Sequence, residues 1–236
     1  MLQRFLLDRR LAPVYLALTA GCSTGVSKVS LLPAEATPLG AADVEDLVKP
    51  TQATEHRLHQ FKWKFRDEKG DVAGRGSVRI APPDTIRFDA FGPLGTGKVA
   101  AMAVGDQQVW VAPEKELRKL VPNYQLLWAM FGIVRAPASG TAVRGARDAQ
   151  RAVWQYANGA DTVEYERRFG EKNALITVVR EGGEVVGRAE TTLDANGRPI
   201  AARLDVPSGP ARLNLTFTQS KTPGPFKPDT WSPPEP

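Results

Sequence analysis

One stretch of the chain carries most of the residues of a phosphate-binding loop. Gly92-Pro93-Leu94-Gly95-Thr96-Gly97-Lys98 satisfies the G-x-x-x-x-G-K pattern, in which backbone amides surround a phosphate and the lysine reaches its oxygens. Val99 stands where that loop needs a Ser or Thr hydroxyl for Mg²⁺. The following residues, Ala100 to Val111, alternate like strands, whereas a phosphate-binding loop must open a helix. A nucleotide hydrolase is therefore a weak hypothesis for this chain.

Two histidines near the start of the patterned region suggest a metal site. Glu55, His56 and His59 include the i, i+3 spacing of neighbours on a helix face. No further cluster of ligands stands near them in the sequence, and a zinc site needs three or four. A solvated helix face is the better interpretation, and we expect no metal.

The remaining titratable residues do not combine into a catalytic set. With only two histidines, the chain has no credible Ser-His-Asp or Cys-His triad. Glu164 and Glu166 share a strand face beside Arg167 and Arg168, which indicates charge pairing on a wet surface. The net charge of +5 is spread along the chain and lacks the basic stripe of a nucleic-acid reader. We expect neither an enzyme nor a nucleic-acid-binding protein, and no cofactor.

The single cysteine, Cys22, follows a segment with the features of a secretory signal. Arg4, Arg9 and Arg10 precede an apolar run, Leu11 to Gly21, that is too short to span a bilayer. A single cysteine excludes an intrachain disulfide and leaves a modification site or a reactive thiol. The pattern predicts a signal peptide over residues 1–21, with an incidental or buried cysteine as the alternative.

The residues that end this segment, Thr19-Ala20-Gly21-Cys22, resemble the bacterial lipobox. The resemblance implies that the thiol is diacylated and becomes the N-terminus after cleavage, and two acyl chains suffice for stable attachment to a bilayer. Ser23 stands where an Asp would retain the protein at the inner membrane, so the resemblance implies the periplasmic face of the outer membrane. Residues 22–42 then serve as a lipidated tether.

Alternation of apolar and polar residues with period two dominates the middle of the chain. Phe61, Trp63 and Phe65 alternate with cations, which predicts a half-buried strand. Turn signals such as Gly105-Asp106 and Asn196-Gly197 separate the later strands. Such a succession of short strands predicts one domain over residues 43–220, a mainly β antiparallel barrel or strongly curved sheet.

A few segments depart from this alternation. Helical turns are expected over Asp43–Leu47 and Glu55–Leu58, ahead of the first strand. Tyr124–Val134 is apolar on nearly every face of a helix, so it must be buried, and we expect it to plug the sheet. Residues 221–236 contain too many prolines to pair in a sheet and are expected to be an extended or disordered tail.

The order of these features resembles the LolA/LolB-like family of incomplete antiparallel barrels. The likeness is most specific over Arg87–Pro137, where a strand, Gly92-Pro93-Leu94-Gly95, two further strands and Leu127-Trp128-Ala129-Met130-Phe131-Gly132 follow one another. The strand, turn and strand of Arg203–Ser220 resemble the end of the family's domain. The resemblance implies a half-barrel closed by helices, whose apolar hollow holds the acyl chains of lipoproteins, and the anchored LolB branch inserts them into the outer membrane.

The same resemblance implies roles for particular residues. Leu94 would be the exposed leucine of a protruding loop that pushes lipoproteins into the membrane, although an aliphatic side chain there could also fold back over the rim as core. The aromatic residues that would line the hollow, or fill it as ordinary core, are Trp63, Phe65, Phe88, Trp110, Trp128 and Phe131.

The sequence therefore leads to a monomeric, lipid-anchored outer-membrane protein that binds acylated lipoproteins. Its other partners would be membrane lipid and a LolA-like periplasmic carrier. A related branch of uncharacterised lipoproteins shares the fold, so a non-enzymatic envelope scaffold or accessory lipoprotein is the alternative. A continuous apolar hollow would favour transport, and a packed interior would favour the scaffold.

Overall fold

One antiparallel sheet organises the molecule. The computed structural model describes residues 29–93, 97–105, 107–112, 123–137, 141–207 and 211–233. Within these residues, thirteen strands lie in the order β1-β7-β8-β9-β10-β11-β12-β13-β2-β3-β4-β5-β6. The strands are β1 (Thr37–Pro38), β2 (Arg57–Asp67), β3 (Gly70–Ala81), β4 (Thr85–Phe91), β5 (Lys98–Val104), β6 (Gln107–Ala112), β7 (Ala142–Arg147), β8 (Arg151–Asn158), β9 (Asp161–Arg168), β10 (Ala174–Glu181), β11 (Glu184–Leu193), β12 (Pro199–Val206) and β13 (Ala211–Lys221).

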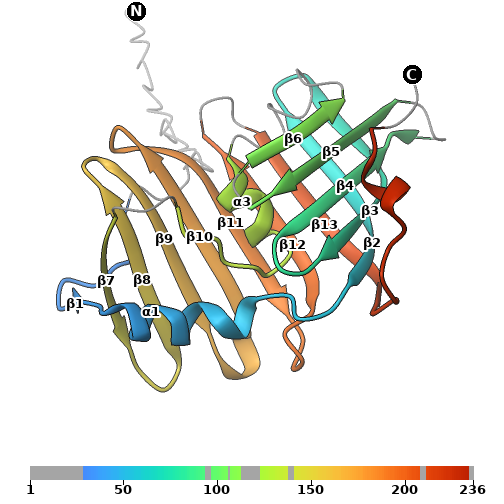
Figure 1. The fold of residues 1–236 in the computed structure, drawn as a ribbon. Coiled ribbons are helices and arrows are strands. Elements are labelled where there is room, and N and C mark those ends of the chain that lie inside the picture. Colours follow the sequence, from blue (N-terminus) through green and yellow to red (C-terminus); the bar gives the residue numbers. More distant parts are fainter. Residues whose placement is uncertain are drawn as a thin grey trace, which may run out of the picture.

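The sheet curves strongly without closing into a barrel (Figure 1). The strands at its two ends are β1, which pairs with β7, and β6, which pairs with β5. The short helix α3 lies inside the curve, on the concave face (Figure 1). The predicted fold class, a mainly β antiparallel half-barrel with a helical plug, is confirmed.

The β2–β3 hairpin shows why the aromatic residues of β2 occupy the concave face. Phe61 pairs with Gly76, and Trp63 pairs with Gly74. A Cβ atom on Gly76 would lie 2.5 Å from Cε2 of Phe61, and one on Gly74 would lie 2.7 Å from Cζ2 of Trp63. Both positions require glycine because the rings occupy the space that a side chain would need.

The helical segments among the described residues are short. They are α1 (Ala41–Val48), α3 (Tyr124–Ala129) and the 3-10 turns η1 (Lys49–Thr51), η3 (Gly170–Lys172) and η4 (Pro228–Trp231). Helix α1 includes the turns expected over Asp43–Leu47, and its apolar side chains pack against the core. No helix in the described ranges is both long enough and apolar enough to cross a bilayer.

Helix α3 is shorter than predicted. The side chain of Asn123 caps it by accepting a bond from the backbone N–H of Gln125 at 2.8 Å. It ends at Ala129 and not at Val134, because Gly132 adopts a φ of 77° and its N–H donates back to the carbonyl of Ala129 at 2.9 Å. A left-handed glycine of this kind ends a helix. The residues after it continue as a buried extended segment.

The helical turn expected over Glu55–Leu58 is wrong, because this part of the chain pairs with β3 and β13 at the start of β2. His59 is therefore a strand residue, only 1% exposed, and its Nδ1 lies 2.7 Å from Oγ of Ser220. His56 lies instead against the ring of Phe226, at a centroid distance of 5.3 Å. The two histidines do not form a solvated helix face.

A buried carboxylate holds the N-terminal segment on the outer, convex face of the sheet. Glu164 of β9 accepts bonds from Ser30 Oγ and the N–H of Leu31, both at 2.7 Å, and from Gln155 Nε2 at 2.8 Å. It also pairs with Arg180 at 2.9 Å. We call these five residues the Glu164 clamp. Further along the same segment, β1 adds to the edge of the sheet beside β7.

The clamp corrects the prediction that Glu164 and Glu166 lie on a wet surface. Their exposed fractions are 1% and 4%. Glu166 pairs with Arg168 at 2.7 Å on the same face. The charge pairing was correctly anticipated, but the carboxylates are buried, Glu164 beneath the segment that contains Ser30 and Leu31.

The described part of the C-terminal segment, which was expected to be an extended or disordered tail, is docked on the outer face of β4 and β6 around the turn η4. Nη1 of Arg87 donates to the carbonyls of Thr230 and Ser232 at 2.5 and 2.8 Å. Nε1 of Trp110 donates to the carbonyl of Trp231 at 2.9 Å. Side chains of the sheet thus satisfy the carbonyls of a proline-rich segment that cannot itself pair as a strand.

Candidate apolar binding site

Phenylalanine rings join the strands of one half of the sheet to the segment that follows α3. The rings of Phe61 and Phe88 stack at a centroid distance of 5.5 Å. Phe131 lies 6.4 Å from Phe61 and 6.0 Å from Phe217 of β13. Aromatic pairs of this geometry contribute about 0.5–1.5 kcal/mol each beyond their buried area. The concave face here is apolar and continuous from β13 to β4.

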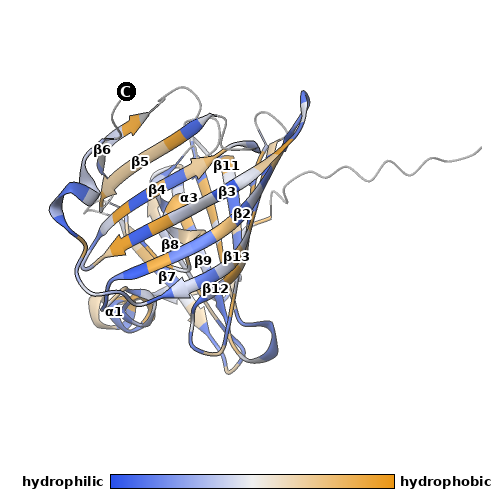
Figure 2. Ribbon diagram, turned by 90° about the vertical axis from the view of Figure 1, so that its right-hand side faces the viewer, coloured by the Kyte–Doolittle hydropathy of each residue, from blue (hydrophilic) through white to orange (hydrophobic). Residues whose placement is uncertain are grey.

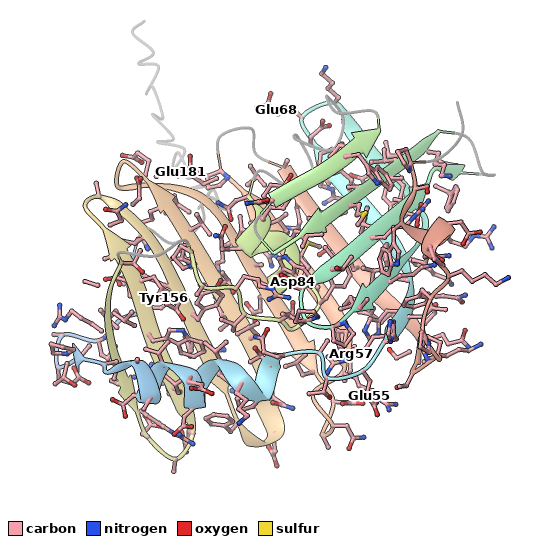
Figure 3. The ribbon with its side chains drawn as sticks, in the orientation of Figure 1. Glu55, Arg57, Glu68, Asp84, Tyr156 and Glu181 are labelled. Carbon is pink, nitrogen blue, oxygen red and sulfur yellow. The ribbon has the colours of Figure 1, made fainter. Side chains whose placement is uncertain are left out.

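The other half of the concave face carries larger, partly polar rings. Trp154 of β8 stacks on Tyr165 of β9 at 5.4 Å, and Tyr156 meets Tyr165 edge-on at 6.1 Å; Tyr156 is labelled in Figure 3. The hydroxyl of Tyr165 donates to the carbonyl of Arg135 at 2.7 Å. Burial raises the pKa of Tyr165 far above its ordinary value, so this hydroxyl stays a neutral donor.

Two side-chain hydrogen bonds fix α3 against the sheet. Nε1 of Trp128 donates to the carbonyl of Gly105 at 2.7 Å, and Oγ1 of Thr191 donates to the carbonyl of Ala129 at 2.8 Å. The guanidinium of Arg135 lies 4.2 Å from the centre of the Trp128 ring. Otherwise α3 contacts β10 and β11 through apolar side chains. Hydrophobic packing is therefore the main interaction that holds α3 on the sheet.

The structure brings together some of the predicted lining residues. Phe88, Trp128 and Phe131 lie in the core on the concave side, and Trp63 and Phe65 are half-buried against it. Trp110 lies on the outer face instead, where its ring is 5.2 Å from the guanidinium of Arg87. Its neighbour Val111 takes the inward position. Cys22 and Leu94 lie outside the described residues.

The interior between α3 and the sheet is filled by side chains. Leu126 and Trp128 are 0% exposed, and Met130 and Phe131 are 1% exposed. Gly187 of β11 lets α3 approach closely, since a Cβ atom there would lie 2.6 Å from Cδ1 of Leu126. An acyl chain could therefore enter this interior only by displacing α3 or the segment that follows it.

Sequence reasoning missed a polar site on the outer face. Asp89 of β4 is 4% exposed and is bound by Arg79 and Arg87, both at 2.9 Å. The alternation of Arg87 and Asp89 with apolar residues was the available signal, because it places both on one face of β4. Nothing local in the sequence showed that the C-terminal segment would cover this part of the strand.

No family model and no curated protein matches the sequence. Among solved structures, the chain is similar to a domain named as an outer membrane lipoprotein-sorting protein from Vibrio parahaemolyticus, at 6% identity over 80% of this chain and 94% of that chain, with a TM-score of 0.49. It is also similar to a LolA superfamily protein from Nitrosomonas europaea, at 10% identity over 83% and 98% of the two chains, with a TM-score of 0.45. A DUF1329 family protein from Desulfovibrio piger matches at 6% identity over 80% and 95%, with a TM-score of 0.42. One of these structures is thus named as a member of the LolA superfamily.

Proposed function

We propose that this protein binds the acyl chains of lipoproteins on the concave face of its sheet and helps to insert them into the outer membrane. The observation that carries the proposal is the covering of that face. A continuous apolar surface extends from β8 to β5, and a six-residue helix, α3, covers the part of it that β10 and β11 form. Acyl chains are recognised by apolar area, at about 0.8 kcal/mol per CH₂ group buried.

The filled interior gives this binding site a defined mode of action. The side chains of α3, such as Leu126 and Leu127, occupy the positions that an acyl chain would take. Exchange of one apolar occupant for another changes the buried area little, so it costs little free energy. The protein would then bind its cargo only moderately tightly, so the cargo can pass on to a bilayer.

The membrane attachment belongs to the same proposal. A diacylated Cys22 would anchor the chain at the periplasmic face of the outer membrane, and Leu94 would touch the bilayer from the loop between β4 and β5. In the antiparallel order, β4 and β10 run in the same direction, so that loop and Arg180 of the Glu164 clamp share one rim of the sheet. The same rim carries Glu68 and Glu181 in Figure 3. Anchor and insertion loop would therefore meet the membrane together.

The partners would be acylated lipoproteins, membrane lipid and a LolA-like carrier, with the protein acting as a monomer. The lipoprotein would pass from the carrier to this protein and then to the bilayer, driven by differences in binding free energy and with no catalytic step. Hydrophilic and hydrophobic residues alternate along the strands (Figure 2). The hydrophobic ones face the concave side, so that side would receive the cargo.

The packed interior is the outcome that favours the second candidate, an accessory lipoprotein of the envelope that works as a scaffold. In that case α3 would be a permanent part of the core and would never leave the sheet. The two candidates differ in one physical property, which is whether α3 can be displaced by an acyl chain.

A cross-link tests this property directly. In a version that lacks residues 1–22, the double variant Ala129→Cys with Thr191→Cys puts one thiol on α3 and one on β11. The two residues are in contact, because Oγ1 of Thr191 donates to the carbonyl of Ala129 at 2.8 Å. The oxidised protein is mixed with a carrier loaded with radiolabelled lipoprotein, and label is followed to the protein and to liposomes. We expect transfer to be lost on oxidation and restored by a reductant.

Insertion is tested with a second pair of variants in the same assay. Leu94→Glu should block delivery to liposomes while binding to the protein persists. Ile200→Glu is the matched control, because Ile200 is 48% exposed on β12, which does not adjoin the β4–β5 loop.

The cross-linked variant separates the two candidates. Binding of label in both oxidation states would show that the acyl chains bind elsewhere, and no binding in either state would support the scaffold.

A further inference from the structure

Three carboxylates on the outer face of strands β12, β13, β2, β3 and β4 are each bound by two cations. In every case one arginine meets its carboxylate through two nitrogens, a geometry that fixes both partners. The three groups are Arg203, Arg212 and Asp205; Lys64, Arg66 and Asp71; and Arg79, Arg87 and Asp89. Because each group holds two positive charges and one negative charge, this face carries an excess of positive charge.

Further cations increase this excess at one level of the sheet. Lys62, Arg75 and Lys98 lie in one row, since Lys62 pairs with Arg75, Arg75 with Phe91, and Phe91 with Lys98. Within the described part of the chain, no ion pair is recorded for these three cations. Figure 2 shows this face toward the viewer, with α3 behind the sheet.

A pocket opens on this face between β3, β4 and β5, and its volume is about 280 Å³. Its walls include Ser77 and Arg79 of β3, Asp89 of β4 and Lys98 of β5. Arg87, Phe91 and Thr230 complete it, so the docked C-terminal segment forms one wall. A water molecule takes up about 30 Å³, so the space admits a tetrahedral anion with several waters.

The donors of this pocket are not equally engaged. Arg87 binds Asp89 through Nε and Nη2, and its Nη1 binds Thr230 and Ser232. Among the described residues, Arg79 donates one hydrogen bond, from Nη1 to Asp89, although a guanidinium has five N–H donors. Lys98 is exposed, with its ammonium 5.8 Å from the centre of the Phe91 ring.

We propose that this pocket is an anion site that binds a phosphate group. Three cations and one carboxylate leave two positive charges in excess, which matches the charge of a phosphate monoester. Arg79 and the hydroxyl of Ser77 supply donors from β3, and Lys98 supplies a donor from β5, so donors lie on both sides of β4. The site does not depend on the handling of lipoproteins, because it lies on the opposite face of the sheet from α3.

This site differs from a nucleotide-binding loop, although Lys98 ends a G-x-x-x-x-G-K pattern. Lys98 is the first residue of β5, and the chain continues as a strand where a phosphate-binding loop would open a helix. The phosphate would therefore meet side chains that project from strands. Its source could be a lipid headgroup or a small phosphate compound.

Binding of inorganic phosphate to the full chain carrying Cys22→Ser, measured by calorimetry at low salt, tests the proposal. Lys98→Gln should weaken binding about tenfold, the loss that about 1.4 kcal/mol produces. Lys98→Arg should retain most of the affinity. Lys172→Gln removes an exposed charge from η3, outside the pocket, and should change the affinity less than about twofold.

The same proteins are then sedimented with phosphatidylcholine vesicles that contain phosphatidic acid, whose headgroup is a phosphate monoester. If Lys98→Gln weakens binding to both probes, the site takes a lipid headgroup, and if it weakens only phosphate binding, the site takes a small phosphate compound. Either result supports the pocket. Failure of the parent protein to bind phosphate would overturn the proposal, as would equal weakening by Lys98→Gln and Lys172→Gln.

Discussion

Replacement of Trp128 by Phe tests whether the plug is held by the contacts described above. Trp128 is 0% exposed, donates to the carbonyl of Gly105 at 2.7 Å and stacks under the guanidinium of Arg135 at 4.2 Å. Loss of the hydrogen bond costs about 1 kcal/mol. The cost is no larger because the carbonyl of Gly105 is only half-buried, so water can partly replace the indole. The weaker cation–π contact of a phenyl ring adds about 0.5–1 kcal/mol. We expect Trp128→Phe to lower the free energy of unfolding by about 2 kcal/mol.

The assay is urea unfolding followed by circular dichroism, together with binding of an apolar fluorophore to the folded protein. Trp231→Phe is the control, since Trp231 is bound to the sheet through its backbone carbonyl and not its indole nitrogen. If α3 is displaceable, fluorophore binding should rise in Trp128→Phe before global unfolding begins. A loss of stability below about 0.5 kcal/mol, within the usual range of surface substitutions, would refute the assignment of Trp128 as the anchor of the plug.

Further predictions concern the hairpin, the clamp and the buried histidine. Gly76→Ala should destabilise the protein by about 1–3 kcal/mol or more in the same unfolding assay, because its Cβ would lie 2.6 Å from the carbonyl of Asp89, whereas Gly224→Ala, with nothing within 4 Å, should be neutral. Glu164→Gln should remove the charge that pairs with Arg180 at 2.9 Å and lower the free energy of unfolding; hydrogen exchange should show the Leu31 amide losing protection, and an unchanged rate would contradict the clamp. Burial, with Arg57 and Arg198 nearby, lowers the pKa of His59 to about 4, below its unfolded value of about 6.5. The unfolded chain therefore binds the proton first, so stability should fall by up to about 3 kcal/mol as pH drops from 6.5 to 4, and His59→Gln should flatten that slope.

Local pattern was enough to predict an antiparallel sheet and the inward face of β2, but it did not single out β3, β7 or β8 as strands. Phe61, Trp63 and Phe65 show period two because one side of β2 is buried and the other is wet. The end of α3 was missed because apolar character does not distinguish a helix from a buried extended segment, and only the φ of Gly132 decides between them. Trp110 was assigned to the wrong face because a register shift lies between Met102 and Ala103 in the pairing of β5 with β6.

The polar features of the structure were harder to anticipate, because they join distant parts of the chain. Ser30 and Glu164 are 134 residues apart, and Arg87 and Thr230 are 143 residues apart. A carboxylate on a strand reads as solvated unless the segment that covers it is known. The buried Glu164 and the outer-face pocket therefore became visible only in three dimensions.

The Glu164 clamp limits where an anchored molecule could work. Ser30 is the eighth residue after Cys22, so an acylated cysteine could lie no more than about 28 Å from the clamp, at about 3.5 Å per residue. This length of chain is close to the thickness of the hydrocarbon core of a bilayer, roughly 30 Å. If Cys22 is acylated, a protein attached at this distance cannot cross the periplasm to collect cargo. Its cargo would then have to be brought to the membrane by a carrier that diffuses freely.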